Sequence, residues 1–180
     1  MPNTGVSLIT STDDIAGVFA RKRFLMNTYA DAASFLAMSR GMIYLYEAVS
    51  DKAINDIIAD YLILLKRLLV LEYGYTMTEM DQWSKVYRTR LANQEIPRPL
   101  STVARNFWSK MSAEERFIQP VLQMMARGES VAAAVPFLAT LIKAGDSELS
   151  PHEIFRKLEA KWRKNPFGET LLMSIQAEMR

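Results

Sequence analysis

The stretch from Asp51 to Gly74, DKAINDIIADYLILLKRLLVLEYG, decides the fold class of this chain. Its apolar residues recur three and four positions apart, which is the period of an α-helix, and no strand-like alternation interrupts them. Ser50 and Asp51 offer side-chain oxygens for the N-cap, and Gly74 is suited to end the helix. The wide apolar stripe predicts that the helix over 51–73 is the most buried of the domain.

Outward from this segment, every other strong periodicity is also helical. We predict an all-α fold, a multi-helix bundle of eight or nine helices joined by short turns. Ser112 with Glu115, and Ser150 with Pro151, are start signals for two further helices. The remaining helices are expected at about 12–41, 43–50, 76–91, 100–110, 113–127, 130–143, 151–163 and 168–180.

The chain of 180 residues is long enough to bury a substantial core. Residues 1–11 are expected to form a flexible lead, and 12–180 a single helical domain. The clearest break is NQEIPRP at 93–99, where two prolines one residue apart exclude a helix. This segment is therefore a candidate sub-boundary within the domain.

Three glycines are predicted to be structural turns that end helices, namely Gly41, Gly128 and Gly145. At Gly128 and Gly145 we expect the left-handed backbone that glycine adopts most readily after a helix. Ser130 is predicted to cap the helix that follows Gly128.

The composition argues against most catalytic chemistries. The chain has no cysteine and a single histidine, His152, which excludes disulfides, thiolate zinc sites and multi-histidine metal sites. His152 beside Glu153, and the carboxylates of Asp56 and Asp60, are interpreted as helix-surface residues rather than ligands. We therefore expect no enzyme activity, no catalytic residue, no cofactor and no metal site.

No run of about 20 apolar residues predicts a transmembrane helix, and the N-terminus lacks the basic and apolar regions of a signal peptide. The formal net charge of +2 is too small for a protein that coats nucleic acid. We expect a cytoplasmic location, at most at the cytoplasmic face of the inner membrane.

One electrostatic feature stands out, the segment RKLEAKWRK at 156–164, in which Arg156, Lys157, Lys161, Arg163 and Lys164 surround Trp162. Basic residues beside a tryptophan are typical of contact with an anionic membrane surface. We hypothesise that these six residues contact an anionic membrane or an acidic partner surface. The alternative is an ordinary solvated helix face.

The segment from Met124 to Trp162 also resembles a known family. Gly128, Ser130 and the aliphatic residues after them fit the pattern G-x-S-(aliphatic)-x-x-A-(aliphatic), and Pro136 and an Ala-Gly-Asp turn ending at Asp146 follow. This pattern is similar to the cytoplasmic domain of the GspF/PilC-type inner-membrane platform proteins of type II secretion and type IV pilus machines. Asp146 stands where that family favours glutamate.

The resemblance implies a non-enzymatic scaffold for protein transport that contacts the assembly ATPase and neighbouring components of the pilus or secretion machine. Asp146 would then be a charged contact at a turn, and the basic segment 156–164 would face lipid head groups or the ATPase. The resemblance also implies that membrane spans follow Arg180 in the natural chain.

Two other classes of protein stay open. A soluble helical adaptor or secretion chaperone would bind a partner helix in a methionine-lined groove, for which Met124 and Met125 are best placed. A helical nucleic-acid-binding regulator would use the aromatic and basic residues of 83–90, but no recognised motif accompanies them, so nucleic acid is disfavoured as a partner. A homo-oligomer is compatible with each class.

Overall fold

Helices account for the regular secondary structure of the part of the chain that the computed structural model describes, residues 14–146 and 148–180, apart from one isolated β-bridge between Tyr44 and Pro99. The all-α prediction is confirmed. In chain order the elements are α1 (Ile15–Arg21), the π-helix η1 (Lys22–Asn27), α2 (Thr28–Met38), α3 (Leu45–Ser50), α4 (Lys52–Tyr73), α5 (Met77–Leu91), α6 (Leu100–Val103), α7 (Phe107–Lys110), α8 (Gln119–Ala126), α9 (Ala134–Gly145), α10 (Pro151–Trp162) and α11 (Gly168–Glu178).

Because α1, η1 and α2 follow one another without a break, the described residues form ten separate helices rather than eight or nine. The additional helix arises because the predicted helix over 100–110 is split into α6 and α7. Asn106 separates the two with a left-handed backbone, φ 57°. Asparagine tolerates this conformation better than most residues other than glycine.

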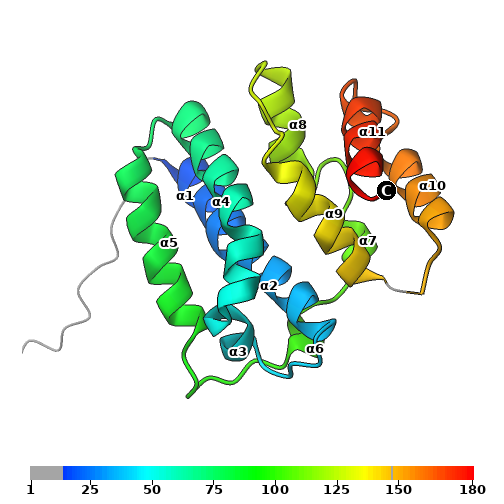
Figure 1. The fold of residues 1–180 in the computed structure, drawn as a ribbon. Helices are drawn as coiled ribbons and strands as arrows, with labels where there is room; N and C mark the ends of the chain where they lie inside the picture. Colours follow the sequence, from blue (N-terminus) through cyan, green and yellow to red (C-terminus); the bar gives the residue numbers. More distant parts are fainter. Residues whose placement is uncertain (1–13, 147) are drawn as a thin grey trace, which may run out of the picture.

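Helix α4 is bounded by the residues that the sequence predicts. The Asp51 carboxylate accepts a hydrogen bond of 2.8 Å from the backbone amide of Ile54, and Gly74 ends the helix with φ 71°. The apolar stripe of α4 is buried against α2, α5, α8 and α9 (Figure 1). Burial of each large aliphatic side chain stabilises the fold by about 1.5–3 kcal/mol, so this stripe is a large part of the core.

Helix α9 connects the N-terminal helices to the last two. It packs against α2 and α4 and also against α11, which in turn packs against α10 (Figure 1). The rings of Tyr61 and Phe137 stack with their centroids 4.2 Å apart, which joins α4 to α9. One hydrophobic cluster therefore runs from Ala20 in α1 to Ile175 in α11.

The segment 93–99 is held against the chain before α3. The backbone amide of Leu45 donates to the carbonyl of Arg98 at 2.9 Å, and the amide of Leu100 donates to the carbonyl of Ile43 at 2.8 Å. The single domain and its sub-boundary at 93–99 stay predictions, and the flexible lead predicted for 1–11 lies outside the described residues.

Two predicted helix starts are wrong, and a proline explains each. Residues 112–118 form turns and α8 begins at Gln119, so Ser112 and Glu115 form no capping box. Likewise α9 begins at Ala134, and Ser130 only accepts a long bond of 3.4 Å from the amide of Ala132. Earlier starts would have placed Pro120 and Pro136 inside a helix, where proline lacks the amide proton and collides with the preceding turn.

The predicted glycine turns are of two kinds. Gly41 and Gly128 follow α2 and α8 with φ 76° and φ 73°, in the left-handed region. Gly145 is instead the last residue of α9, without a positive φ, and a Cβ at this position would overlap the ring of Phe107. Glycine is needed there because α9 and α7 approach closely, not because the chain turns.

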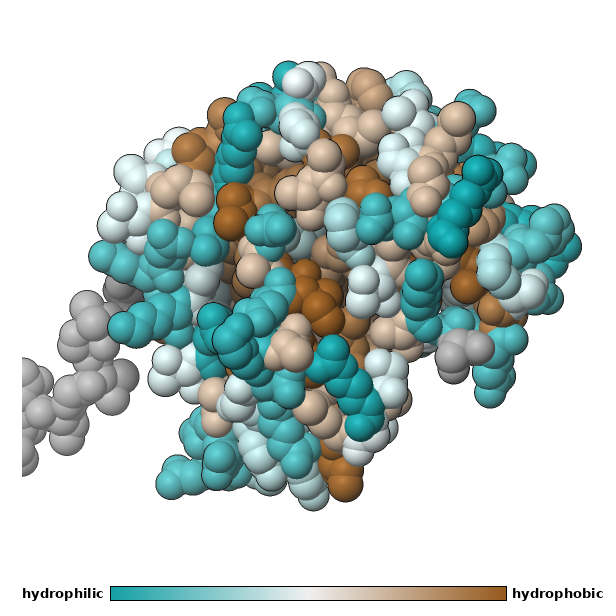
Figure 2. Space-filling model, in the orientation of Figure 1, coloured by the Kyte–Doolittle hydropathy of each residue, from teal (hydrophilic) through white to brown (hydrophobic). Residues whose placement is uncertain are grey.

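Hydrophilic residues cover much of the face shown in Figure 2, and hydrophobic residues lie between them in separate patches. Within the described ranges, no helix combines the length and the apolar character needed to span a membrane. Even α4, which has 22 residues, is interrupted by Lys66 and Arg67.

Candidate functional site

A groove of about 470 Å³ lies between η1 and the turn segment 112–118. Five of its seven lining side chains are charged, one is an amide and one is aromatic. A hollow with several converging polar groups is the usual form of a site for a small polar molecule. The lining residues are Phe19, Lys22, Arg23, Asn27, Glu114, Glu115 and Arg116.

The π-helix decides which side chains reach this groove. In η1 the backbone hydrogen bonds join residues five positions apart, and the hydroxyl of Thr28 also donates to the carbonyl of Arg23 at 2.9 Å. Lys22 and Asn27 are five positions apart, so the wider turn brings both to the groove. Short π segments inside α-helices frequently occur at functional sites.

Lys22 and Asn27 are available to a ligand. Lys22 is exposed and Asn27 is half-buried. Across residues 14–146 and 148–180, neither side chain makes an ion pair or a hydrogen bond with another side chain. The groove therefore presents an ammonium or amine group and an amide group that the fold itself does not use.

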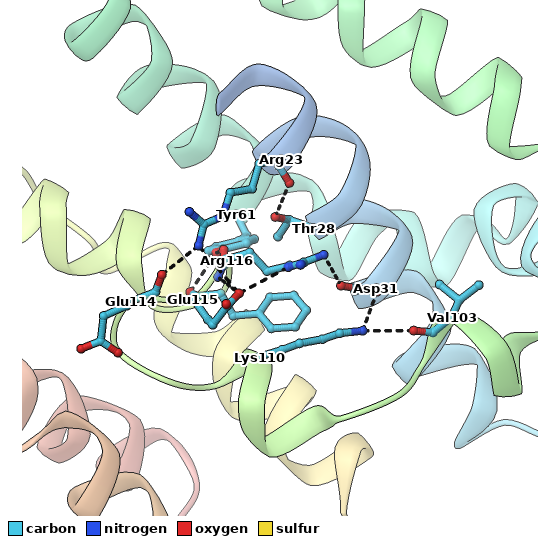
Figure 3. Close-up of polar contacts among 10 residues, drawn as sticks. Arg23, Thr28, Asp31, Tyr61, Val103, Lys110, Glu114, Glu115 and Arg116 are labelled. Atoms are coloured by element: carbon cyan, nitrogen blue, oxygen red, sulfur yellow. Dashed lines mark hydrogen bonds and ion pairs between the residues drawn. The ribbon is translucent and has the colours of Figure 1, made fainter. Parts of the chain in front are cut away.

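A buried ion-pair network lies behind the groove, with Asp31 at its centre (Figure 3). Asp31 belongs to α2 and is 5% exposed, and its carboxylate accepts from Lys110 Nζ at 2.8 Å and from Arg116 Nη1 at 2.9 Å. Lys110 also donates to the carbonyl of Val103 at 3.0 Å. The network joins α2 to the ends of α6 and α7 and to the turn that lines the groove.

The main effect of this network is to fix positions. Burial raises the pKa of the Asp31 carboxyl, while the hydrogen bonds and charges of Lys110 and Arg116 oppose that rise. A buried ion pair adds little net stability compared with well-packed apolar residues, but the loss of one partner leaves an uncompensated charge. Arg116 is therefore held in one place beside the groove.

Tyr61 fixes the same turn through its backbone. This side chain of α4 is fully buried, and its hydroxyl donates to the carbonyl of Phe117 at 2.9 Å and to that of Arg116 at 3.2 Å. Burial raises the pKa of the Tyr61 hydroxyl well above its ordinary value, so the group stays a donor. The segment 112–118 is thus held by α2 and by α4 together.

Two glutamates complete the groove. Arg23 Nη2 donates to the backbone carbonyl of Glu114 at 2.8 Å. The carboxylate oxygen Oε2 of Glu115 lies 3.7 Å from Arg23 Nη2 and 3.7 Å from Arg116 Nε. Two guanidinium groups from distant parts of the chain therefore face one carboxylate.

The predicted basic segment covers the second half of α10 and the two residues after it. Arg156, Lys157, Arg163 and Lys164 are exposed, and Lys161 is half-buried. Lys157 Nζ lies 4.8 Å from the ring centroid of Trp108, and Lys161 Nζ lies 3.5 Å from the hydroxyl of Ser112. Two of the five basic side chains thus contact the protein's own surface.

Trp162 and Asp146 have internal partners. Trp162 is 0% exposed, and its Nε1 donates to the carbonyl of Met111 at 2.7 Å. It shares a helix face with Leu158, which is also buried, so the prediction of a surface contact at Trp162 is wrong. Asp146 accepts a hydrogen bond of 2.8 Å from Trp108 Nε1 and so holds that ring.

The residues of the groove were not predicted from the sequence. The only local signal is the basic triplet Arg21, Lys22 and Arg23 within an otherwise apolar helix. Asp31 and Arg116 are 85 positions apart, and no sequence pattern pairs them.

Other parts of the described structure offer less chemistry. Between residues 14 and 146 and from 148 on, no group of three or more His, Asp or Glu residues could hold a metal ion. A hollow of about 630 Å³ lies beside His152, where α9, α10 and α11 meet, and half of its lining side chains are apolar. No ion pair among the described residues fixes a charged side chain in it.

Comparison with known proteins assigns the family. The family model for the mannitol dehydrogenase C-terminal domain matches residues 14–150. Similar proteins include the mannitol-1-phosphate 5-dehydrogenases of Pyrenophora tritici-repentis, 30% identical over 66% of this chain and 30% of the relative, and of Bacillus velezensis, 30% identical over 70% and 35%. The enzyme of Paenarthrobacter aurescens is 26% identical over 76% of this chain and 36% of its own length. The chain thus spans about a third of the length of the curated relatives that it matches.

These matches overturn the resemblance to a pilus or secretion platform protein, because the G-x-S turn and the Ala-Gly-Asp turn lie within a region that a different family model covers. The relatives are dehydrogenases, so four further predictions are wrong as well. These are a non-enzymatic scaffold, an assembly ATPase as partner, a role in protein transport and a place at the inner membrane. The adaptor and nucleic-acid alternatives have no support in these matches. With the match extending over most of its length, the chain belongs to the mannitol dehydrogenase C-terminal domain family.

Proposed function

We propose that this chain forms the substrate-facing part of a dehydrogenase that acts on a sugar-alcohol phosphate of the mannitol-1-phosphate kind. The groove between η1 and the segment 112–118 would be its substrate site. The observation that supports this most directly is that Lys22, which has no ion-pair partner in residues 14–146 and 148–180, lines the same groove as Asn27 and two positioned guanidinium groups. A charged phosphorylated substrate stays in the compartment where it is made, so a cytoplasmic location is part of the proposal.

The dehydrogenation of an alcohol removes a proton from the hydroxyl oxygen and a hydride from the carbon that bears it. The amine of Lys22, when neutral, can accept that proton, and in the reverse reaction the ammonium can donate it to the carbonyl oxygen. The Asn27 side chain has both donor and acceptor groups, which suit a neighbouring hydroxyl of the polyol. These two side chains would orient the reacting alcohol.

The phosphate of the substrate needs cationic partners in the same groove. Arg23 and Arg116 each present a planar guanidinium, whose parallel N–H groups match phosphate oxygens in pairs. Both side chains are 25% exposed, so they reach the groove while most of their length stays packed. A substrate with one anionic end and a chain of hydroxyls therefore fits the charge pattern of the lining.

The hydride also needs an acceptor, and the described residues do not fit one. A nicotinamide dinucleotide is commonly bound by a glycine-rich turn between a strand and a helix. The seven glycines of this chain stand far apart in the sequence, and residues 14–146 and 148–180 contain no strand beyond one isolated bridge. We therefore assign the acceptor no residue of this chain.

The test is a dehydrogenase assay on the natural protein that contains this sequence, with mannitol-1-phosphate as substrate and a nicotinamide dinucleotide as the added acceptor. Lys22→Met should lower kcat by about 10²–10⁴, the range for the loss of a proton-transfer group. Lys85→Met is the control, because Lys85 is an exposed lysine on α5 away from the groove lining. Activity of Lys22→Met within a few-fold of the unaltered protein would contradict the assigned role.

A further inference from the structure

We infer that Arg23 and Arg116 form an anion site that the carboxylate of Glu115 occupies in the ligand-free protein, and that a phosphate group displaces this carboxylate when it binds. The inference rests on the proposed function for the identity of the substrate, but the anion site itself rests on the contacts shown in Figure 3. Glu115 would then be an internal competitor for the phosphate.

Glu115 fills this position poorly. Its Oε2 atom is 3.7 Å from Arg23 Nη2 and from Arg116 Nε, which are ion-pair distances and too long for hydrogen bonds. Arg116 Nε is a buried donor that has no hydrogen-bond partner in the part of the chain that the structure describes. A buried donor of this kind is destabilising unless a ligand or water binds it, so the site is better satisfied by an anion that reaches closer.

The two guanidinium groups are held in place before any ligand arrives. Arg23 donates to the backbone carbonyl of Glu114 at 2.8 Å, and Arg116 pairs with the buried Asp31 at 2.9 Å. Neither of these contacts involves Glu115. Because both arginines are positioned, little side-chain entropy is lost when an anion binds between them.

Glu115 can leave without disturbing the turn. Its side chain is 40% exposed, and its backbone carbonyl accepts from the amides of Ile118 and Gln119 at 3.0 Å and 2.8 Å. These backbone bonds hold the segment 112–118 whichever way the carboxylate points. The movement needed is therefore the rotation of one partly exposed side chain. It breaks one long hydrogen bond, of 3.4 Å, which Glu115 Oε2 accepts from the backbone amide of Arg116.

A tetrahedral phosphate is the class of ligand that fits. Its oxygens can accept from both guanidinium groups at hydrogen-bond distance, which the single oxygen of Glu115 does not achieve. The Glu115 carboxylate offsets one of the two positive charges of Arg23 and Arg116 and repels any anion that approaches the site. A ligand must therefore outcompete this carboxylate in order to bind.

The experiment measures the binding of inorganic phosphate to this chain by isothermal titration calorimetry at neutral pH. Glu115→Gln should bind phosphate at least about fivefold more tightly, because one negative charge next to the site is removed. Glu114→Gln is the matched control, since Glu114 is the adjacent residue in the same groove but its carboxylate faces neither guanidinium in an ion pair. We expect a change of no more than about twofold for the control, as befits an exposed charge.

Arg23→Gln should weaken phosphate binding, and mannitol, which lacks the phosphate, should bind equally to the unaltered chain and to Glu115→Gln. Equal phosphate affinities for Glu115→Gln and Glu114→Gln would overturn the displacement of Glu115. That outcome leaves mannitol-1-phosphate oxidation to be judged by its own assay. Conversely, tighter phosphate binding by Glu115→Gln in a protein that does not oxidise mannitol-1-phosphate would establish the anion site and refute the proposed substrate.

Discussion

We expect the buried network around Asp31 to contribute strongly to the stability of the fold. Asp31→Asn keeps the size and shape of the side chain but removes the negative charge between Lys110 and Arg116. Two charge-assisted hydrogen bonds, each contributing about 1.5–3 kcal/mol, are weakened or lost. Two cations whose side chains are only 15% and 25% exposed are then left without their counter-charge.

Partial compensation limits the loss. Lys110 keeps its bond to the carbonyl of Val103, and Arg116 still has the carboxylate of Glu115 at 3.7 Å. We therefore expect Asp31→Asn to lower the free energy of unfolding by about 3 kcal/mol, the lower end of the range for breaking a buried ion pair. The assay is urea unfolding at neutral pH followed by far-ultraviolet circular dichroism.

The control is the same substitution at an exposed pair. Lys52 and Asp56 are 2.6 Å apart, but their side chains are 87% and 62% exposed. Asp56→Asn should change the free energy of unfolding by less than about 0.5 kcal/mol. If Asp31→Asn and Asp56→Asn destabilise the protein equally, burial does not set the strength of this network and the reasoning fails.

Two further predictions concern helix ends. Gly145→Ala should lower the melting temperature more than Gly128→Ala, because a Cβ at 145 overlaps the ring of Phe107 and overpacking costs about 1–3 kcal/mol. At 128 the Cβ meets open space, so only the left-handed backbone disfavours alanine, by about 1 kcal/mol. Equal melting temperatures would contradict the close approach of α7 and α9. Hydrogen bonds from Ser150 lower the pKa of the Glu153 carboxyl below 4.5, the hydroxyl having the larger effect and the backbone amide the smaller. This N-cap therefore stabilises α10 fully above pH 4.5, and the stabilisation is lost as the pH falls through the lowered pKa. The protection factors of the α10 amides, which correct exchange rates for their intrinsic dependence on pH, should fall on acidification in the unaltered chain but stay constant in Glu153→Gln. Identical pH profiles would show that the cap does not stabilise the helix.

The fold was predictable where local signals and apolar spacing agreed. The predicted helix over 51–73 is α4, Lys52–Tyr73, because Asp51, the apolar stripe and Gly74 all act within the segment itself. Ser150 and Glu153 form a capping box at the start of α10 for the same reason. The start predicted at Ser112 failed because Pro120 and the contacts of Tyr61 with the turn outweigh a local capping pattern.

The candidate site was not predictable because its geometry depends on contacts between distant residues. The π-helix changes which backbone groups bond to one another, but the spacing of the buried residues Phe24, Leu25 and Thr28 does not differ visibly from that of an α-helix. The partners of Asp31 lie 79 and 85 positions away. The residue types of Lys110 and Arg116 did not predict a role for either side chain. Only the packing of α7 and of the segment 112–118 against α2 brings the two side chains to Asp31.

The position of α9 has a consequence for the order in which the chain becomes stable during its synthesis. The apolar faces of α2 and α4 are completed by α9, whose last residue, Gly145, is 54 positions after the end of α5 at Leu91. At about 5–20 residues per second, a ribosome needs roughly 3–10 s to make this stretch, and until then the first helices expose apolar surface. A nascent chain arrested after Leu91 should therefore be more sensitive to protease and bind chaperones more strongly than one arrested well beyond Gly145. Equal protease resistance of the two would mean that the first helices are stable without α9.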